Sequence, residues 1–116
     1  MTTRETIEGY FEKLAAKAEW QECFADDVVF TSYTSPTKEV KGRAAYLEAT
    51  KRFYSTIRGV EVRQILVDGT RAVALTRYVI QQPGKPSFAS DVAEVFSVKG
   101  ETIDSLGIYF DTAPYK

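Results

Sequence analysis

The chain has 116 residues, and its 15 basic side chains nearly balance its 16 acidic ones, for a net charge of −1. This length suffices for a hydrophobic core, and we expect one domain over residues 1–116. Without a basic stripe, nucleic acid is not expected as a partner. No apolar run reaches membrane-spanning length, and the N-terminus lacks a signal-peptide pattern, so we expect a cytoplasmic protein without membrane contact.

Acid–base chemistry is restricted by composition, because the sequence contains no histidine and only one cysteine, Cys23. The missing histidine excludes Ser-His-Asp and Cys-His catalysis, a histidine general base and histidine-ligated zinc. A lone cysteine excludes an internal disulfide. Carboxylates, tyrosines and lysines remain as acid–base candidates. We expect no cofactor and no metal.

The first half of the chain is predicted to be mainly helical. Thr2 and Glu5 have capping-box spacing, and the apolar residues that follow recur with helical periodicity. β-branched and aromatic residues then predict a short strand, and a loop around Pro36 precedes a further helix. The expected elements are helices over 3–18, 20–24 and 43–56, a short strand over 28–33, and a loop over 34–38.

The second half is predicted to be an antiparallel meander of four strands. Asp68-Gly69 is typical of a hairpin turn, and a second tight turn lies at residues 99–102. The four strands are expected over 60–67, 71–81, 88–98 and 103–111. The fold class is therefore α+β, with three N-terminal helices packed on one face of an antiparallel sheet of four long strands plus one short strand. The tail after residue 111 is expected to be loose.

Glu94 does not fit the apolar strand face on which it lies. Strand side chains alternate with period two, so Glu94 shares a face with Val92 and Phe96. A carboxylate on such a face is costly unless it is paired or protonated. Two interpretations follow: a pocket acid with a raised pKa, or a carboxylate near the sheet rim paired with an arginine such as Arg77.

The strand over 71–81 is apolar on both faces. Val73, Leu75 and Val79 alternate with a second set of apolar residues that includes Ala74 and Ile80. A sheet covered by helices on one face does not require this. We therefore expect a homodimer formed through the outer face of the sheet.

Several segments resemble the nuclear transport factor 2-like superfamily, which includes SnoaL-like domains and ketosteroid isomerases. They are Trp20 with Phe-Ala-Asp-Asp-Val at 24–28, Val-Lys-Gly-Arg at 40–43, Glu-Val-Phe-Ser-Val-Lys-Gly at 94–100 and Ile-Tyr-Phe-Asp at 108–111. The resemblance covers nearly the whole chain. It implies a sheet that curls around the helices to form a cone-shaped fold with a pocket, on which several unrelated activities occur.

The resemblance also places individual residues. Tyr10 matches the oxyanion-hole tyrosine of ketosteroid isomerases, and Glu94 matches their protonated aspartic acid. The position of their general base holds Ser32. The histidine of the SnoaL cyclases is absent, as is the Arg-x-Asp motif of the epoxide hydrolases with this fold.

Two functions are consistent with these observations. In the first, the protein binds a hydrophobic small molecule, and Glu94 and Tyr10 polarise an oxygen during an isomerisation, cyclisation or dehydration. In the second, the same fold is a non-catalytic ligand-binding or dimerisation module. The candidate ligand contacts are Phe30, Ser32, Tyr54, Tyr78, Val92, Phe96, Leu106, Ile108 and Phe110.

Overall fold

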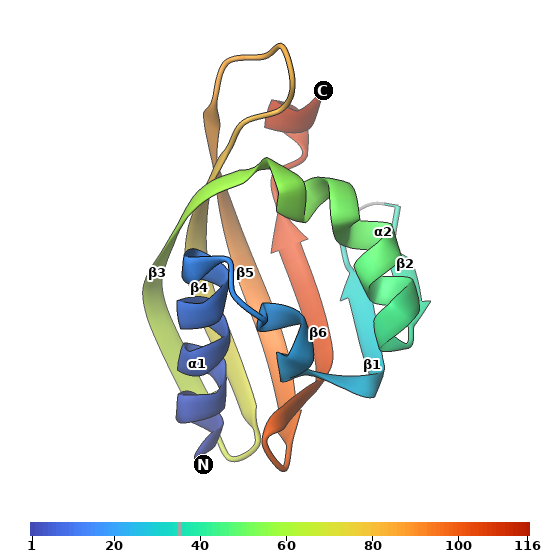
Figure 1. Ribbon diagram of the computed structural model, residues 1–116, viewed down its shortest axis with the longest axis vertical. Coiled ribbons are helices and arrows are strands. Elements are labelled where there is room, and N and C mark those ends of the chain that lie inside the picture. Colours follow the sequence, from blue (N-terminus) through green and yellow to red (C-terminus); the bar gives the residue numbers. More distant parts are fainter. Residues whose placement is uncertain (35) are drawn as a thin grey trace.

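The computed structural model describes residues 1–34 and 36–116, which form two α-helices, two short 3₁₀ helices and one six-stranded sheet (Figure 1). The α+β class is confirmed, whereas the expected three helices and five strands are not matched. The elements are α1 (Thr3–Ala16), η1 (Trp20–Cys23), β1 (Phe24–Ser32), β2 (Lys38–Lys41), α2 (Arg43–Thr56), β3 (Ile57–Asp68), β4 (Arg71–Ile80), β5 (Phe88–Lys99), β6 (Thr102–Phe110) and η2 (Ala113–Tyr115).

The sheet has the strand order β2-β1-β6-β5-β4-β3, and it is mixed rather than purely antiparallel. The strands from β3 to β6 form the predicted antiparallel meander. β1 instead pairs in parallel with β6, with Phe30 opposite Leu106. This pairing is possible because the chain travels through β2 and α2 to the far edge of the sheet, and the meander then returns to β1.

The segment between β1 and α2 contains a strand that the sequence did not indicate. β2 pairs antiparallel with β1, with Val40 opposite Phe30. Its residues are mostly charged and exposed, so they carry no apolar alternation. The expected loop over 34–38 includes residue 35, which lies outside the described residues, and β2 begins at the last residue of that range. The short helix over 20–24 is a 3₁₀ turn that ends at Cys23.

Helix α1 begins at the predicted capping box. The Thr2 hydroxyl accepts a hydrogen bond from the Glu5 amide at 3.1 Å, and the Glu5 carboxylate accepts one from the Thr2 amide at 2.9 Å. Lys17, in the left-handed region with φ of 57°, ends the helix two residues before the predicted boundary. The Thr3 hydroxyl donates to the Gly69 carbonyl at 2.7 Å and joins α1 to the turn between β3 and β4.

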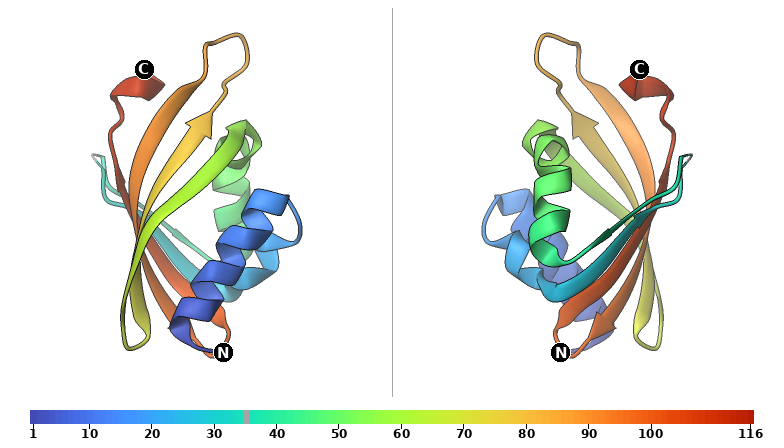
Figure 2. Two further views of the ribbon diagram at one scale, coloured as in Figure 1. Left: turned by 90° about the vertical axis from the view of Figure 1, so that its left-hand side faces the viewer. Right: turned by 90° about the vertical axis from the view of Figure 1, so that its right-hand side faces the viewer.

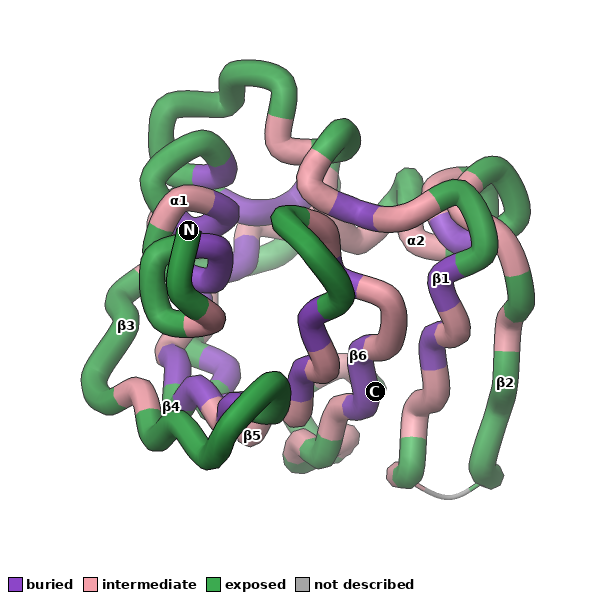
Figure 3. The backbone as a smooth tube through the Cα atoms, turned by 90° about the horizontal axis from the view of Figure 1, so that it is seen from below, coloured by how far each residue is buried: buried purple, intermediate pink, exposed green. Residues whose placement is uncertain are grey.

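Both α-helices lie on the same face of a strongly curved sheet (Figure 2). Register shifts interrupt the β3–β4 pairing at two places, and such bulges increase the bend of a strand. Figure 3 shows buried positions alternating with more exposed ones along β4 and β5, as expected for strands with one covered face. Within the described residues, no helix is long and apolar enough to cross a membrane.

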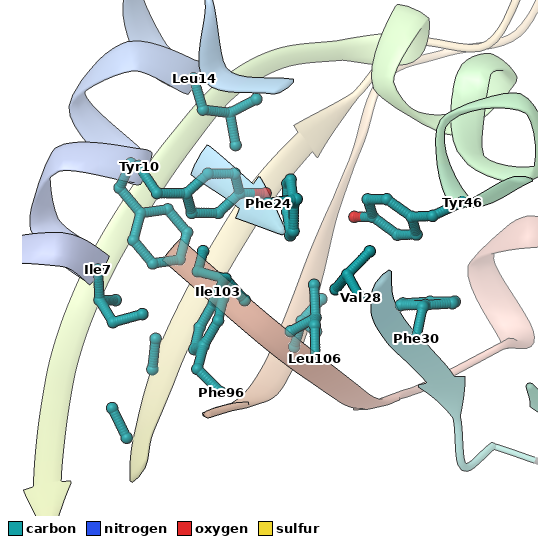
Figure 4. Close-up of a cluster of buried hydrophobic side chains, with 14 of the residues drawn as sticks. Ile7, Tyr10, Leu14, Phe24, Val28, Phe30, Tyr46, Phe96, Ile103 and Leu106 are labelled. Atoms are coloured by element: carbon teal, nitrogen blue, oxygen red, sulfur yellow. The ribbon is translucent and has the colours of Figure 1, made fainter. Parts of the chain in front are cut away.

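The core between the helices and the sheet is rich in aromatic rings (Figure 4). Tyr10 packs against Phe24 with ring centroids 5.2 Å apart, and Phe24 packs against Tyr46 at 4.9 Å. All three side chains are almost completely buried. This cluster connects α1 to α2 and supports the side of α2 that faces the cavity described next.

Candidate functional site

A cavity of about 360 Å³ lies between α2 and the concave face of the sheet. Side chains of α2 form one wall, and β1, β4, β5, β6 and the C-terminal segment form the rest. The lining residues are Phe30, Ser32, Tyr46, Ala49, Thr50, Phe53, Tyr54, Tyr78, Val92, Glu94, Leu106, Ile108, Phe110, Thr112 and Tyr115. Its volume is within the range typical of small-molecule sites.

Glu94 reaches this cavity from the middle of β5, where it lies opposite Ala74 of β4 and Ile108 of β6. Only 3% of the residue is exposed. Its oxygen Oε2 accepts hydrogen bonds from the hydroxyls of Thr76 and Tyr78, both at 2.7 Å. These two donors lie on β4, at alternate positions of the face that carries Ala74, so the sheet itself holds the carboxyl group.

The second oxygen of Glu94 is available to a ligand. Within residues 1–34 and 36–116, no hydrogen bond reaches Oε1. The described residues contain no fully buried polar side-chain atom that lacks a hydrogen-bond partner. Oε1, which has no such partner, is therefore not fully buried. It keeps some accessible surface, and Glu94 is one of the residues that line the cavity.

Burial raises the pKa of Glu94 to about 7, although the hydrogen bonds from Tyr78 and Thr76 act in the opposite direction. Arg77 does not pair with it, and the rim interpretation is therefore wrong. Arg77 makes a bidentate pair with Asp91, at 2.8 and 3.0 Å, on the outer face of the sheet. Arg77 and Asp91 lie opposite each other in the β4–β5 register, and each is an odd number of residues from Thr76 and Glu94 on its own strand. Because strand side chains alternate between the two faces, Arg77 and Asp91 lie on the face opposite Glu94.

Two buried tyrosines, Tyr10 and Tyr46, share hydrogen bonds with the partly buried Tyr54 beside the cavity. The Tyr54 hydroxyl lies 2.8 Å from that of Tyr10 and is also hydrogen-bonded to that of Tyr46. In Figure 4, the hydroxyls of Tyr10 and Tyr46 point toward each other across Phe24. Burial is the main cause that raises the pKa of all three phenols well above the ordinary range, so they are neutral at physiological pH.

The structure does not bring Tyr10 and Glu94 into a direct pair. Tyr10 is not part of the cavity lining, and its hydroxyl contacts Tyr54, which does line the cavity. The hydroxyl bonded to Glu94 belongs to Tyr78. The oxyanion-hole position suggested by the resemblance is therefore separated from the carboxyl group.

Eight of the nine proposed ligand contacts line the cavity: Phe30, Ser32, Tyr54, Tyr78, Val92, Leu106, Ile108 and Phe110. Phe96 does not. It is fully buried in the core, where its ring packs against those of Tyr10 and Phe11, both with centroids 6.0 Å away. Phe96, Glu94 and Val92 are on the same face of β5, but Phe96 packs beneath α1. Glu94 and Val92 lie further along the strand, on the side of the cavity. Whether these residues bind a ligand remains a prediction.

Two groups of lining residues were not identified from the sequence. The first consists of Tyr46, Thr50 and Phe53 of α2, which form one wall of the cavity and are absent from the expected ligand contacts. The tail was expected to be loose, but η2 places Tyr115 against the rings of Phe88 and Phe110. Only the concentration of aromatic residues at the chain end could have indicated this.

Similarity to known proteins agrees with this geometry. The family model described as a SnoaL-like domain matches residues 7–105. No curated protein matches the sequence significantly. One similar solved structure is that of SalBIII, an epoxide hydrolase/cyclase-like enzyme of pyran ring formation in salinomycin. It superposes with a TM-score of 0.81 at 18% identity, and the match covers 94% of this chain and 90% of SalBIII.

Two further structures show the same fold. A candidate SnoaL-like polyketide cyclase from Jannaschia sp. CCS1 has a TM-score of 0.80 at 15% identity and covers 97% of this chain and 88% of its own. An NTF2-like protein of unknown function from Cytophaga hutchinsonii ATCC 33406 has a TM-score of 0.76 at 16% identity, with coverage of 99% and 95%. At these identities the similarity establishes the fold alone.

Proposed function

Because the chain belongs to the SnoaL-like domain family, we propose that it binds a hydrophobic small molecule in the cavity and uses Glu94 to polarise an oxygen of that ligand. The supporting observation is a buried carboxyl group with one oxygen held by two hydroxyls and the other without a hydrogen-bond partner among the described residues, on a side chain that lines the cavity. Isomerisation, cyclisation or dehydration of a carbonyl or hydroxy compound are the reaction classes that this arrangement would serve.

The proposed chemistry uses the protonated form of Glu94. Oε2 accepts from Thr76 and Tyr78, so the carboxyl proton would be carried by Oε1 and donated to the ligand oxygen. A pKa of about 7 makes the group effective near neutral pH, because both protonation states are populated there. General acid–base groups of this kind typically contribute about 10²–10⁴-fold to a rate.

Tyr10 contributes to this proposal as a positioning residue. Its hydroxyl holds that of Tyr54, which lines the cavity and is also bonded to Tyr46. A ligand oxygen near Tyr54 would therefore meet a phenol whose orientation is set from behind by Tyr10.

The alternative function is binding without catalysis, and the composition of the cavity favours it in one respect. Ser32, at the position where ketosteroid isomerases carry their general base, lines the cavity without a carboxylate. Among the described lining residues, Glu94 is the only acid, so no second carboxylate is available to remove a carbon-bound proton.

A ketone probe separates these possibilities. We would measure binding of 2-acetylnaphthalene and, by proton NMR in D₂O, the exchange of its methyl hydrogens for deuterium. The proposal predicts tighter binding at pH 5.5 than at pH 8.5, and faster exchange with the wild type than with Glu94→Gln. Asp91→Asn, on the outer face of the same strand, is the matched control and should behave as the wild type.

Each result of this experiment has a defined meaning. Binding with the predicted pH dependence but without faster exchange would support the non-catalytic function. Absence of binding at both pH values would contradict a hydrophobic ligand site in this cavity.

We also propose that the outer face of the sheet contacts a second copy of the chain. Leu66, Leu75, Val79 and Tyr109 are between 38% and 52% exposed although they are large and apolar. Leu75 is at an odd position of β4, between the buried Ala74 and Thr76, and Leu66 of β3 lies opposite Val73, which is also at an odd position. Both leucines therefore project from the face opposite the helices. An apolar surface of this kind is typical of a protein–protein contact.

Light scattering at micromolar concentration tests this contact. The wild type should have the mass of a dimer, and Leu75→Lys should shift it toward the monomer. Val62→Lys is the matched control: Val62 is 36% exposed, but it lies opposite the buried Thr76 and therefore on the other face. A monomeric wild type would contradict the proposed dimer. The cytoplasmic location expected from the sequence stays a prediction.

A further inference from the structure

The charge in the cavity is not balanced by the protein when Glu94 is ionised. None of the fifteen described lining residues is a lysine or arginine. The nearest arginine on the neighbouring strand, Arg77, is on the opposite face of the sheet and is occupied by Asp91. A buried carboxylate without a cation is costly, and a ligand that supplies one would remove that cost.

The walls of the cavity are suited to a cation for a second, independent reason. Seven of the fifteen described lining residues are aromatic. Within this group, the Phe53 ring packs against two others, with its centroid 5.7 Å from those of both Tyr54 and Tyr78. Aromatic faces attract organic ammonium groups electrostatically, and the attraction is stronger where water is excluded.

We propose that the cavity also binds a hydrophobic amine or quaternary ammonium compound, with its cationic group against Oε1 of ionised Glu94 and its apolar body among the aromatic rings. This inference rests on the cavity being the ligand site of the proposed function. It goes beyond that function because it assigns a ligand class to the ionised state of Glu94, whereas polarisation of an oxygen uses the protonated state.

The affinity for such a cation should depend on the ionisation of Glu94 alone. The other titratable groups near it are Tyr78 of β4, Tyr10 of α1, and Tyr46 and Tyr54 of α2. All four phenols have a pKa raised well above the ordinary value, so they stay neutral up to pH 8.5. The described lining residues of β1 and β6 add no titratable group. Tyr115 of the C-terminal segment also lines the cavity, and burial raises the pKa of its phenol, so it too is neutral in this pH range.

The size of this dependence follows from the pKa of about 7 for Glu94. About 3% of the carboxyl groups are ionised at pH 5.5 and about 97% at pH 8.5. When only the ionised state binds the cation, affinity scales with the ionised fraction. Binding should therefore strengthen by about 30-fold between these pH values.

The experiment compares two probes of the same shape by calorimetry at pH 5.5 and pH 8.5. Benzyltrimethylammonium carries a permanent charge, so its own protonation cannot change with pH. In (2,2-dimethylpropyl)benzene, carbon replaces the nitrogen. The wild type should bind the cation about 30-fold more tightly at pH 8.5 than at pH 5.5. At pH 8.5 the cation should bind about tenfold more tightly than the hydrocarbon.

Glu94→Gln keeps an acceptor for Thr76 and Tyr78 but cannot ionise. It should bind both probes with no pH dependence and lose the preference for the cation. The proposal is overturned when the wild type binds the cation no more tightly than the hydrocarbon at pH 8.5, or binds it equally at both pH values. Hydrocarbon binding alone would leave the proposed function intact, whereas binding of neither this hydrocarbon nor 2-acetylnaphthalene would contradict both.

Discussion

Replacement of Glu94 by glutamine should stabilise the protein relative to the wild type as the pH rises. The pKa of Glu94 is raised from 4.5 to about 7 in the folded state. A carboxyl group whose pKa is raised by folding makes its full contribution to stability at pH values below its pKa in the unfolded state. This contribution is lost as the pH rises through its pKa in the folded state. Glutamine has nearly the same shape and can accept the hydrogen bonds of Thr76 and Tyr78 without ever carrying a charge.

The magnitude follows from the size of the pKa shift. A change of one pKa unit corresponds to about 1.4 kcal/mol, so a rise from 4.5 to about 7 corresponds to about 3 kcal/mol. The free energy of unfolding of the wild type should fall by about this amount relative to Glu94→Gln between pH 4.5 and pH 7.5. Above pH 8 the difference between the two proteins should be constant.

Urea unfolding at closely spaced pH values from 4 to 9 measures this difference directly. Asp91→Asn is the control on the same strand. Because Arg77 lowers the pKa of Asp91, its contribution is present above its unfolded pKa and is lost only as the pH falls. Parallel curves for the wild type and Glu94→Gln between pH 4.5 and pH 7.5 would refute the reasoning, since Glu94 would then titrate as an exposed carboxyl.

Further predictions concern single contacts. Tyr78→Phe removes a donor to the Glu94 carboxylate, so carbon-13 NMR titration should find the pKa of Glu94 higher than in the wild type, and an unchanged midpoint would contradict the hydrogen bond. A Cβ at Gly107 would lie 2.5 Å from the Tyr33 ring, so Gly107→Ala should displace that ring and cost about 1 kcal/mol in urea unfolding. Gly9→Ala, where nothing lies within 4 Å, should instead stabilise α1 by about 1 kcal/mol, and equal effects of the two substitutions would show that the contact with Tyr33 is unimportant.

Patterns within single segments of the sequence determined much of this fold. The capping box of Thr2 and Glu5 set the start of α1, because both hydrogen bonds form within four residues. The turn at Asp68-Gly69 and the alternation of the flanking strands indicated the β3–β4 hairpin. The same alternation placed Glu94 on the apolar face, since the two-residue period of a strand does not depend on its neighbours.

Pairings between distant segments were decided by the tertiary structure. β2 has four mostly charged residues, and it is a strand because β1 supplies its hydrogen-bond partners. The parallel pairing of β1 with β6 depends on where α2 delivers the chain, and no local pattern encodes that. The tail likewise becomes part of the cavity wall only because Tyr115 packs against both Phe88 of β5 and Phe110 of β6, which are distant from each other in the sequence.

The candidate site divides in the same way. Strand periodicity sufficed to identify Glu94 as an acid on an apolar face, but its partners depend on the register between β4 and β5. That register brings Thr76 and Tyr78 to Oε2 and sends Arg77 to the other face. A shift of one residue would have reversed this choice, because each strand residue faces the side opposite its neighbours. The carboxyl group was thus visible in the sequence, whereas its protonation and its free oxygen are properties of the assembled sheet.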